Sequence, residues 1–172
     1  MTRTKPAHIA LRTTVGAAVF GIMAAGNIYG STASAAATGA PVVTLTQTGC
    51  QFVESENGTD HGYSPKSADD CKTINGKSGS DRLARAEPIK LKAGKYVFRV
   101  TNRNVPYELG FWLRSKDYDW RNPLHKVTKT SISGGGLTTG KTNDYEVTLK
   151  PGEYVYSCPL NPTPDYRLVV TQ

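Results

Sequence analysis

The sequence predicts an all-β protein, a Greek-key β-sandwich of about eight short strands with one long irregular insertion after the first strand. The first observation is that short runs of β-favouring residues recur from Pro88 onward, spaced roughly 8–12 residues apart by turn residues. The second is the C-terminal run 149–170, which contains a strand, a cysteine, a proline-rich loop and a closing strand. The third is that residues 1–35 resemble an export signal, so one domain of 137 residues remains in the 172-residue chain.

Residues 1–35 have the composition of a cleavable signal peptide. Basic residues and no acidic ones precede an apolar, Ala/Gly-rich segment over 14–28, and Ala33-Ser34-Ala35 matches an A-x-A cleavage pattern. The apolar segment is short and interrupted by glycine, which argues against a spanning helix, although an uncleaved anchor is the alternative. The chain is therefore expected to be exported to the periplasm or beyond, with no membrane span after cleavage.

The charge distribution argues against nucleic acid as a partner. The signal carries three of the 21 Lys and Arg residues and no Asp or Glu, so its removal lowers the formal charge from +7 to +4. The remaining basic residues are scattered along the chain and form no run. A mixed-charge, solvated surface explains this pattern, and no nucleic-acid partner is expected.

The β-strands are recognised by alternation of apolar and polar residues and by the turns between them. The clearest alternation is over 96–101, and the most apolar strand is expected over 107–113. Three glycines at 134–136 are expected to end a strand. In chain order, strands are predicted over 42–46, 89–91, 96–101, 107–113, 125–133, 144–149, 154–156 and 167–171.

The segment 51–87 differs from the rest of the chain. It contains many Asp, Glu, Ser and Gly residues and few large apolar ones. An insertion of this length in a compact domain is usually functional, flexible or fixed by a cross-link, and Cys71 offers such a cross-link. One or two helical turns are expected over 80–87, capped by Ser80 and ended by Pro88.

Three motifs together resemble the cupredoxins, which are exported copper proteins with a Greek-key β-sandwich. These motifs are Leu-Lys-Ala-Gly-Lys-Tyr-Val-Phe at 91–98, Asn-Val-Pro-Tyr-Glu-Leu at 104–109, and the strand and cysteine at 149–158. A blue-copper site needs two His and one Cys with a weak axial Met. Here Tyr107 stands where the family has its first His, and the loop after Cys158 has neither His nor Met. A type 1 copper electron carrier is therefore not expected.

The chain is most similar to the EfeO-type cupredoxin-like domain of periplasmic iron- and copper-handling proteins. The shared features are Gly49-Cys50 after the first strand, a Leu-Glu-containing central strand at 107–109, and Pro-Gly-Glu-Tyr before a Cys-containing Leu-Asn-Pro loop at 151–162. The resemblance implies a copper or iron ion bound by Cys50, Glu108 and Cys158. His61, in the insertion, is a possible further ligand, although an exposed loop histidine is the alternative. That family has only a few residues where this chain has 51–87.

The three cysteines, Cys50, Cys71 and Cys158, leave two pairings open. Export favours oxidation, and an odd number allows one intramolecular disulfide at most. Cys50–Cys71 would fix the insertion, whereas Cys50–Cys158 would join the first strand to the last loop. Reduced thiolates would suit Cu(I), while oxidised cysteines make a metal-free protein equally plausible.

Two functions follow as expectations, and neither is enzymatic because no nucleophile–base arrangement is found. The first is an exported protein that binds or delivers copper or iron through a non-blue Cys/Glu site, with a periplasmic metal-transport or redox partner. The second is a metal-free accessory or interaction subunit of a periplasmic or membrane-associated complex. In it, a disulfide-stapled sandwich presents the 51–87 insertion to its partner.

Overall fold

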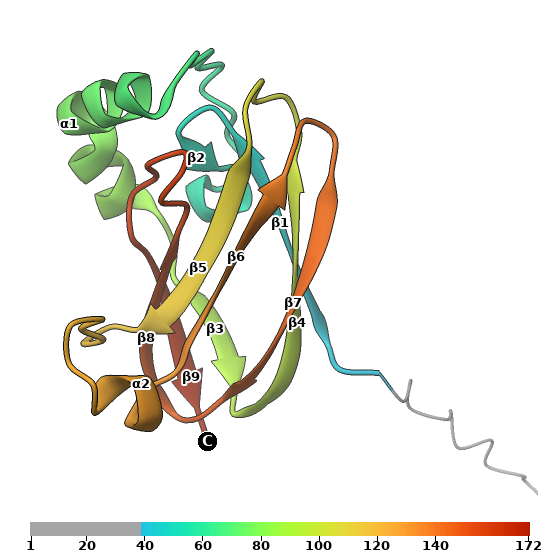
Figure 1. Ribbon diagram of the computed structural model, residues 1–172, viewed down its shortest axis with the longest axis vertical. Coiled ribbons are helices and arrows are strands. Elements are labelled where there is room, and N and C mark those ends of the chain that lie inside the picture. Colours follow the sequence, from blue (N-terminus) through green and yellow to red (C-terminus); the bar gives the residue numbers. More distant parts are fainter. Residues whose placement is uncertain (1–38) are drawn as a thin grey trace, which may run out of the picture. The chain divides into compact units, whose positions relative to one another are not determined.

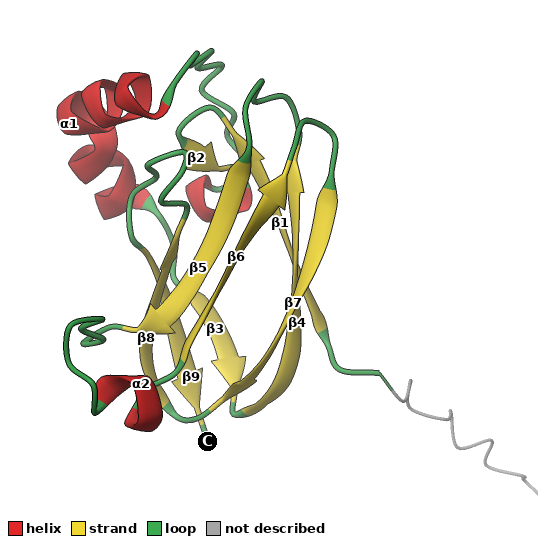
Figure 2. Cartoon of the chain, viewed as in Figure 1, coloured by secondary structure: helices red, strands yellow, loops and turns green. Residues whose placement is uncertain are grey.

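The structure, a computed structural model, describes residues 39–172, and it confirms a β-sandwich (Figure 1). The predicted signal peptide lies outside the described residues. Figure 2 shows the strands forming the body of the domain and the helices lying at its ends. The strands are β1 Val42–Thr48, β2 Gln51–Phe52, β3 Ile89–Lys92, β4 Gly94–Asn102, β5 Leu109–Ser115, β6 Ser131–Leu137, β7 Thr142–Leu149, β8 Gly152–Ser157 and β9 Tyr166–Thr171. The helices are the 3₁₀ turn η1 Glu54–Glu56, α1 Ala68–Arg85 and α2 His125–Thr128.

The nine strands form two mixed sheets. One sheet has the order β2-β1-β4-β7 and the other β3-β9-β8-β5-β6. The pairs β1–β4 and β3–β9 are parallel, and the remaining neighbours are antiparallel. Parallel partners need a crossover between them, so the chain passes from sheet to sheet, which is how residues far apart in sequence reach the same end of the sandwich.

The core lies between the two sheets and is rich in aromatic rings. Phe98 of one sheet stacks on Phe111 of the other, with ring centroids 5.7 Å apart. Phe52 makes edge-to-face contacts with Phe111, Tyr156 and Tyr166 at centroid distances of 5.6–6.1 Å. Offset and edge-to-face pairs of this kind stabilise beyond the area they bury. Every one of these rings is buried, so the short strand β2 closes the core where the insertion begins.

The insertion contains a helix of 18 residues, longer than the one or two turns expected at 80–87. The helix begins where the Asp70 carboxylate accepts the N–H of Ser67 at 3.0 Å, which is half of a capping box. Its buried residues are Cys71, Gly79 and Arg82. The prediction of an irregular segment missed the helix because α1 has no apolar stripe; a disulfide and a buried arginine attach it to the sandwich.

The prediction of a strand over 125–133 was wrong in its first half, because His125–Thr128 form the helical turn α2 and the strand runs over Ser131–Leu137. The three glycines at 134–136 lie within β6 and do not end it. A Cβ at Gly134 would lie 2.8 Å from the Tyr145 ring, and one at Gly110 would lie 2.8 Å from the Gly134 carbonyl oxygen. Gly110 and Gly134 are therefore needed for close approach between β5, β6 and β7, whereas Gly136 has a φ of +80°, which favours glycine.

The two ends of the sandwich differ. α1 lies at the end with the loop after β8, here called the loop end, and α2 lies toward the opposite end (Figure 1). The central strand β5 starts at Leu109, so Tyr107 and Glu108 belong to the segment that leads into it and not to the strand itself. Within residues 39–172, no helix has the length and apolar content needed to cross a bilayer.

Candidate functional site

All three cysteines lie at the loop end. Cys50 and Cys71 form a disulfide, with an S–S distance of 2.07 Å and Cα atoms 5.0 Å apart. Cys158 is a free thiol, and all three side chains are almost completely buried. The structure therefore selects the Cys50–Cys71 pairing, which joins the end of β1 to the first turn of α1.

Asn161, fully buried in the loop after β8, connects the three cysteines. Its Oδ1 accepts the Cys50 N–H at 3.1 Å, and its Nδ2 donates to the Thr48 carbonyl at 3.0 Å. Its own backbone N–H points at the Cys158 sulfur, 3.2 Å away. The Cys71 sulfur lies 3.0 Å from Oδ1, but an oxidised sulfur has no proton, so this is a packing contact. Asn161 thus fills the space between the disulfide and the thiol.

Tyr107 occupies the position where the resemblance places the first copper-binding His. Its hydroxyl lies 3.0 Å from Asn161 Oδ1 and 3.2 Å from the Ser67 carbonyl oxygen at the start of α1. Burial, together with the nearby Cys158 and Asp70, raises the pKa of Tyr107 to about 12. At neutral pH the phenol is therefore a hydrogen-bond donor, which links the segment before β5 to the start of α1 and to the loop after β8.

Cys158 is held by backbone donors. Its sulfur accepts N–H groups from Gly110 at 3.3 Å and from Asn161 at 3.2 Å. Burial raises the pKa of the Cys158 thiol, and these N–H groups offset only part of that effect. The side chain is therefore a neutral thiol at physiological pH.

A buried glutamine lies beneath this cluster. Gln47 is fully buried and donates from Nε2 to the Gly110 carbonyl at 2.8 Å. Among the described residues its Oε1 has no hydrogen-bond partner. Exchanging the two amide atoms would place Oε1 against the Gly110 oxygen, so the assigned orientation is the favourable one. Gly110 thus links Gln47 to Cys158, since its carbonyl accepts from Gln47 and its N–H donates to the Cys158 sulfur.

The other two predicted ligands lie in separate contacts. The exposed Glu108 carboxylate accepts the Gly136 N–H of β6 at 2.8 Å. The His61 Nε2 lies 2.7 Å from Glu56 Oε2, and its ring stacks on Tyr63. Within residues 39–172, no three His, Cys, Asp or Glu side chains gather in a group that could hold a metal ion.

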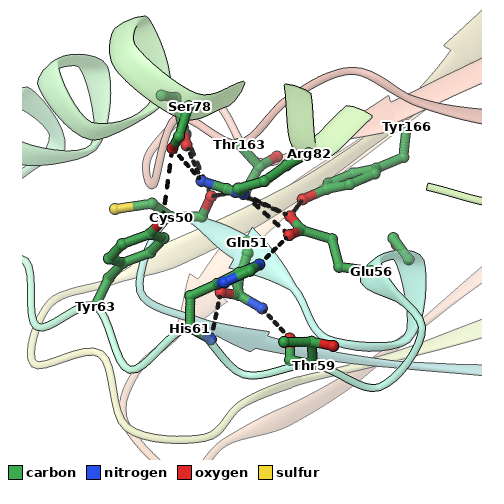
Figure 3. A network of polar contacts seen from close by, with 12 residues as sticks. Cys50, Gln51, Glu56, Thr59, His61, Tyr63, Ser78, Arg82, Thr163 and Tyr166 are labelled. Atoms are coloured by element: carbon green, nitrogen blue, oxygen red, sulfur yellow. Dashed lines mark hydrogen bonds and ion pairs between the residues drawn. The ribbon is translucent and has the colours of Figure 1, made fainter. Parts of the chain in front are cut away.

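Figure 3 shows a second buried polar cluster, centred on Glu56 of η1 and Arg82 of α1. Arg82 Nη2 lies 2.9 Å from Glu56 Oε1, and both side chains are at most 4% exposed. Tyr166 of β9 donates its hydroxyl to the same carboxylate. The remaining guanidinium hydrogens go to the Cys50 carbonyl at 3.1 Å and the Asn75 Oδ1 at 2.7 Å. Every face of the ion pair is therefore matched by a partner, as a buried charge requires.

The pKa values of this cluster follow from its contacts. Burial alone would raise the pKa of Glu56, but the hydrogen bonds from Arg82 and Tyr166, with the charge of Arg82, hold it below its ordinary value. The Glu56 contacts outweigh burial at Arg82 as well and raise its pKa. For Tyr166, burial is the main cause of a raised pKa, reinforced by Glu56. At neutral pH, Glu56 is therefore a charged carboxylate and Arg82 a charged guanidinium.

Sequence patterns pointed to the cysteines but not to Asn161 or to the Glu56–Arg82 pair. Arg82 lies eleven residues after Cys71, which is three helical turns, so both face the sandwich. The Ser67-Ala-Asp-Asp70 start could have identified the helix, and this spacing could then have identified its buried face. Asn161 gives no such signal, because its role depends on contacts with residues more than 50 positions away.

Replacing Asn161 by alanine is expected to lower the free energy of unfolding by about 2–3 kcal/mol, because it leaves the Cys50 N–H and the Thr48 carbonyl buried without a partner. Urea denaturation of the oxidised protein measures this loss. Asn143→Ala is the matched control, since that half-buried side chain makes one hydrogen bond, to Gly135. Equal losses for the two variants would contradict the role assigned to Asn161.

The Cys158 thiol is expected to react with iodoacetamide at pH 8 at least about 100-fold more slowly in the native protein than in guanidinium, because it is buried and protonated. Mass spectrometry of timed samples gives both rates. One alkylated site per chain in guanidinium without reductant is expected. Three sites would mean that the disulfide is absent, and a fast native rate would mean that the loop after β8 opens readily.

No family model and no curated protein matches this chain. The solved structures similar to it include cupredoxins. Auracyanin B has a TM-score of 0.48 and 14% identity over 80% of this chain and 93% of that one. An oxidised amicyanin variant has a TM-score of 0.39 and 12% identity over 79% and 86%. A copper nitrite reductase from Nitrosomonas europaea has a TM-score of 0.34 and 18% identity over 50% and 30%.

At such low identity these are similarities of fold, and the β-sandwich assignment rests on the strand pairing described above. The chain thus has a β-sandwich fold in which a disulfide, a buried thiol and an asparagine occupy the loop end.

Proposed function

We propose that this protein is an exported accessory module that works without a metal ion. In this proposal the sandwich presents the 51–87 insertion, and chiefly α1, to a partner protein of a periplasmic or membrane-associated complex. The observation that carries the proposal is the Cys50–Cys71 disulfide, which joins the insertion to β1 at the position where the resemblance had placed a thiolate ligand. A disulfide sulfur has no thiolate to offer a metal.

The other predicted metal ligands already have hydrogen-bond partners within the protein, which supports the same function. Glu108 is bonded to Gly136, and His61 is bonded to Glu56. Cys158 is protonated and buried beneath Asn161. Each donor would have to give up a formed contact before it could approach an ion, and such losses oppose binding.

The rigidity of α1 also favours a docking role. The disulfide fixes the first turn of the helix, and the Arg82–Glu56 pair fixes its last turns. A surface held in one conformation loses less conformational entropy on binding than a flexible one. The exposed side of α1 is polar and of mixed charge, which suits a partner recognised by complementary charges. Its exposed charged residues include Asp69, Lys72, Lys77 and Asp81.

A second function, copper handling in the reduced state, is favoured by the convergence of the three cysteines on Asn161. A dithiol reductant would convert Cys50–Cys71 into two thiols beside the asparagine whose N–H touches the Cys158 sulfur: Asn161 Oδ1 contacts the Cys71 sulfur and the Cys50 backbone N–H. Thiolates are soft ligands that suit Cu(I). The EfeO-type assignment, with copper or iron as cargo, belongs to this second function.

Metal titration of the oxidised and the reduced protein separates the two functions. The metal-free module is expected to bind no stoichiometric Cu(I), Cu(II) or Fe(III) in either state, as measured by equilibrium dialysis with elemental analysis. If the oxidised protein retains one ion per chain, and Cys158→Ser abolishes this, the metal-free proposal is wrong. If only the reduced protein retains Cu(I), and Cys71→Ser abolishes it, the second function is correct.

The docking role of α1 is tested by site-specific photo-crosslinking in the producing cell. A photoreactive residue at Lys77, exposed on α1, is expected to capture one defined partner protein. The matched control is a photoreactive residue at Glu146, exposed on β7. Capture of the same product from both positions, or from neither, would contradict presentation of α1.

A further inference from the structure

An exposed apolar group lies on the segment between β5 and β6, which includes α2. The side chains are Trp120, 59% exposed, Leu124, 63% exposed, and Val127, 85% exposed. Residues 39–172 expose five large apolar side chains, and these three occur within eight consecutive positions. Single exposed apolar residues are ordinary, but a cluster of them marks an interaction site.

The segment holds these side chains outward in a fixed structure. The Asp119 N–H donates to His125 Nδ1 at 2.9 Å, and Lys129 forms an ion pair with Asp117. At its base, the Ser115 N–H donates to the Thr130 carbonyl at 2.9 Å. These contacts stabilise the conformation in which the three apolar side chains are exposed. Leu124 and Val127 are three positions apart on the α2 turn, so they share one of its faces.

Two cations without carboxylate partners border the apolar group. The Arg121 guanidinium lies 5.1 Å from the centre of the Trp120 ring, and Lys126 lies within α2. In the described part of the chain neither forms a salt bridge, whereas Lys116 and Lys129 pair with Glu153 and Asp117. The tip of the segment therefore combines an aromatic ring, two aliphatic side chains and free positive charge.

The position of this group in the fold separates it from the disulfide and α1, which lie at the loop end (Figure 1). β1 starts toward the same end of the sandwich as α2 (Figure 1), with Val42 opposite Val97 of β4.

We propose that Trp120, Leu124 and Val127, with Arg121 and Lys126, form a docking surface for an anionic lipid bilayer. Tryptophan and aliphatic side chains partition into the boundary between headgroups and acyl chains, while arginine and lysine bind lipid phosphates. A stable protein interface needs about 20–30 residues on each side, many more than this group provides, whereas a bilayer accepts a few inserted side chains. This surface does not depend on the function proposed for α1.

Co-sedimentation with vesicles tests the proposal. The full exported chain is expected to bind vesicles of equal parts phosphatidylglycerol and phosphatidylcholine, and to bind phosphatidylcholine vesicles at least about tenfold more weakly. The double variant Leu124→Ser/Val127→Ser is expected to lose at least about tenfold in binding to the anionic vesicles. Arg121→Gln/Lys126→Gln is expected to lose a similar factor and most of the sensitivity to salt.

Matched controls come from the loop end. Leu160→Ser removes an exposed apolar side chain, and Lys72→Gln/Lys77→Gln removes two exposed cations of α1. Both should bind like the wild type, and all variants keep the same N-terminus, so any contribution from that segment is common to them. Equal binding by the α2 variants and the wild type would overturn the proposal. So would lipid-free self-association, seen by sedimentation velocity, that Leu124→Ser/Val127→Ser abolishes, because the group would then be an interface between chains.

Discussion

Replacing Cys50 and Cys71 together by serine is expected to lower the free energy of unfolding by about 3 kcal/mol. The disulfide closes a loop with a sequence separation of 21, and this loop contains the part of the insertion that precedes α1. Without the bond, the unfolded chain gains the entropy of an open loop. The folded chain loses the attachment of the first turn of α1, and a polar helix without packing is only marginally stable in water.

Guanidinium denaturation without reductant measures this loss, and limited proteolysis locates it. The first cleavage of the double variant is expected within 66–85, while the sandwich remains intact. Cys158→Ser is the matched control, since it removes a buried sulfur but leaves the disulfide in place. An unchanged free energy of unfolding together with an unchanged cleavage pattern would mean that the buried ion pair alone holds α1.

The strands were predictable where one face is buried and the other solvated. The runs over 96–101 and 144–149 alternate in sequence and lie in β4 and β7, whose exposure alternates along most of their length. β6 was harder to predict because four of its seven residues, from Ser133 to Gly136, are exposed, so no apolar alternation marks the strand. Gly134 is explained by the Tyr145 ring and Gly135 by the Glu108 carboxylate, each of which a Cβ would meet within 3.0 Å, and Gly136 by its φ of +80°; local sequence reveals none of these.

The candidate site was only partly predictable, for a similar reason. The cysteines were identified by type and number, but the choice between two pairings required the position of α1. Glu108 was placed on the central strand, whereas the strand begins one residue later and its carboxylate faces β6. Asn161 is a common loop residue in sequence, and only the folded chain brings it to Cys50 and Cys158.

The disulfide and the Glu56–Arg82 pair have complementary roles in the insertion. Arg82 also donates to the Cys50 carbonyl, so the ion pair and the disulfide meet at one residue of the turn between β1 and β2. Removing the disulfide is therefore expected to weaken the ion pair, and the reverse. The losses in free energy of unfolding from substitutions at the two should not be additive.

Replacing Arg82 by methionine is expected to lower the free energy of unfolding by about 3–5 kcal/mol, the largest loss from any single substitution proposed for this protein. Methionine preserves much of the volume but leaves the Glu56 carboxylate buried with only Tyr166 and His61 as side-chain partners. Arg99→Met is the matched control. Its partner is Asp144, both side chains are more than 40% exposed, and such a pair contributes at most about 1 kcal/mol.

A double-mutant cycle separates the ion pair from packing. Glu56→Gln combined with Arg82→Met is expected to cost less than the sum of the two single substitutions, because no buried charge then lacks a partner. Equilibrium denaturation of the four proteins at pH 7 gives the coupling free energy. Strict additivity would mean that the guanidinium and the carboxylate contribute independently, which the 2.9 Å contact between them argues against.

The dependence of stability on pH below 7 gives a further test of the Glu56–Arg82 pair. Because the contacts of Glu56 lower its pKa in the folded state, the unfolded chain binds its proton at a higher pH than the folded chain does. The stabilisation from Glu56 is therefore complete above its unfolded pKa of about 4.3 and is lost as the pH falls through the lower, folded pKa. Thermal unfolding of the wild type and of Glu56→Gln between pH 7 and pH 3 should show a shallower acid decline for the variant. Parallel curves would show that other carboxylates control acid unfolding and that the Glu56 pKa is not lowered by folding.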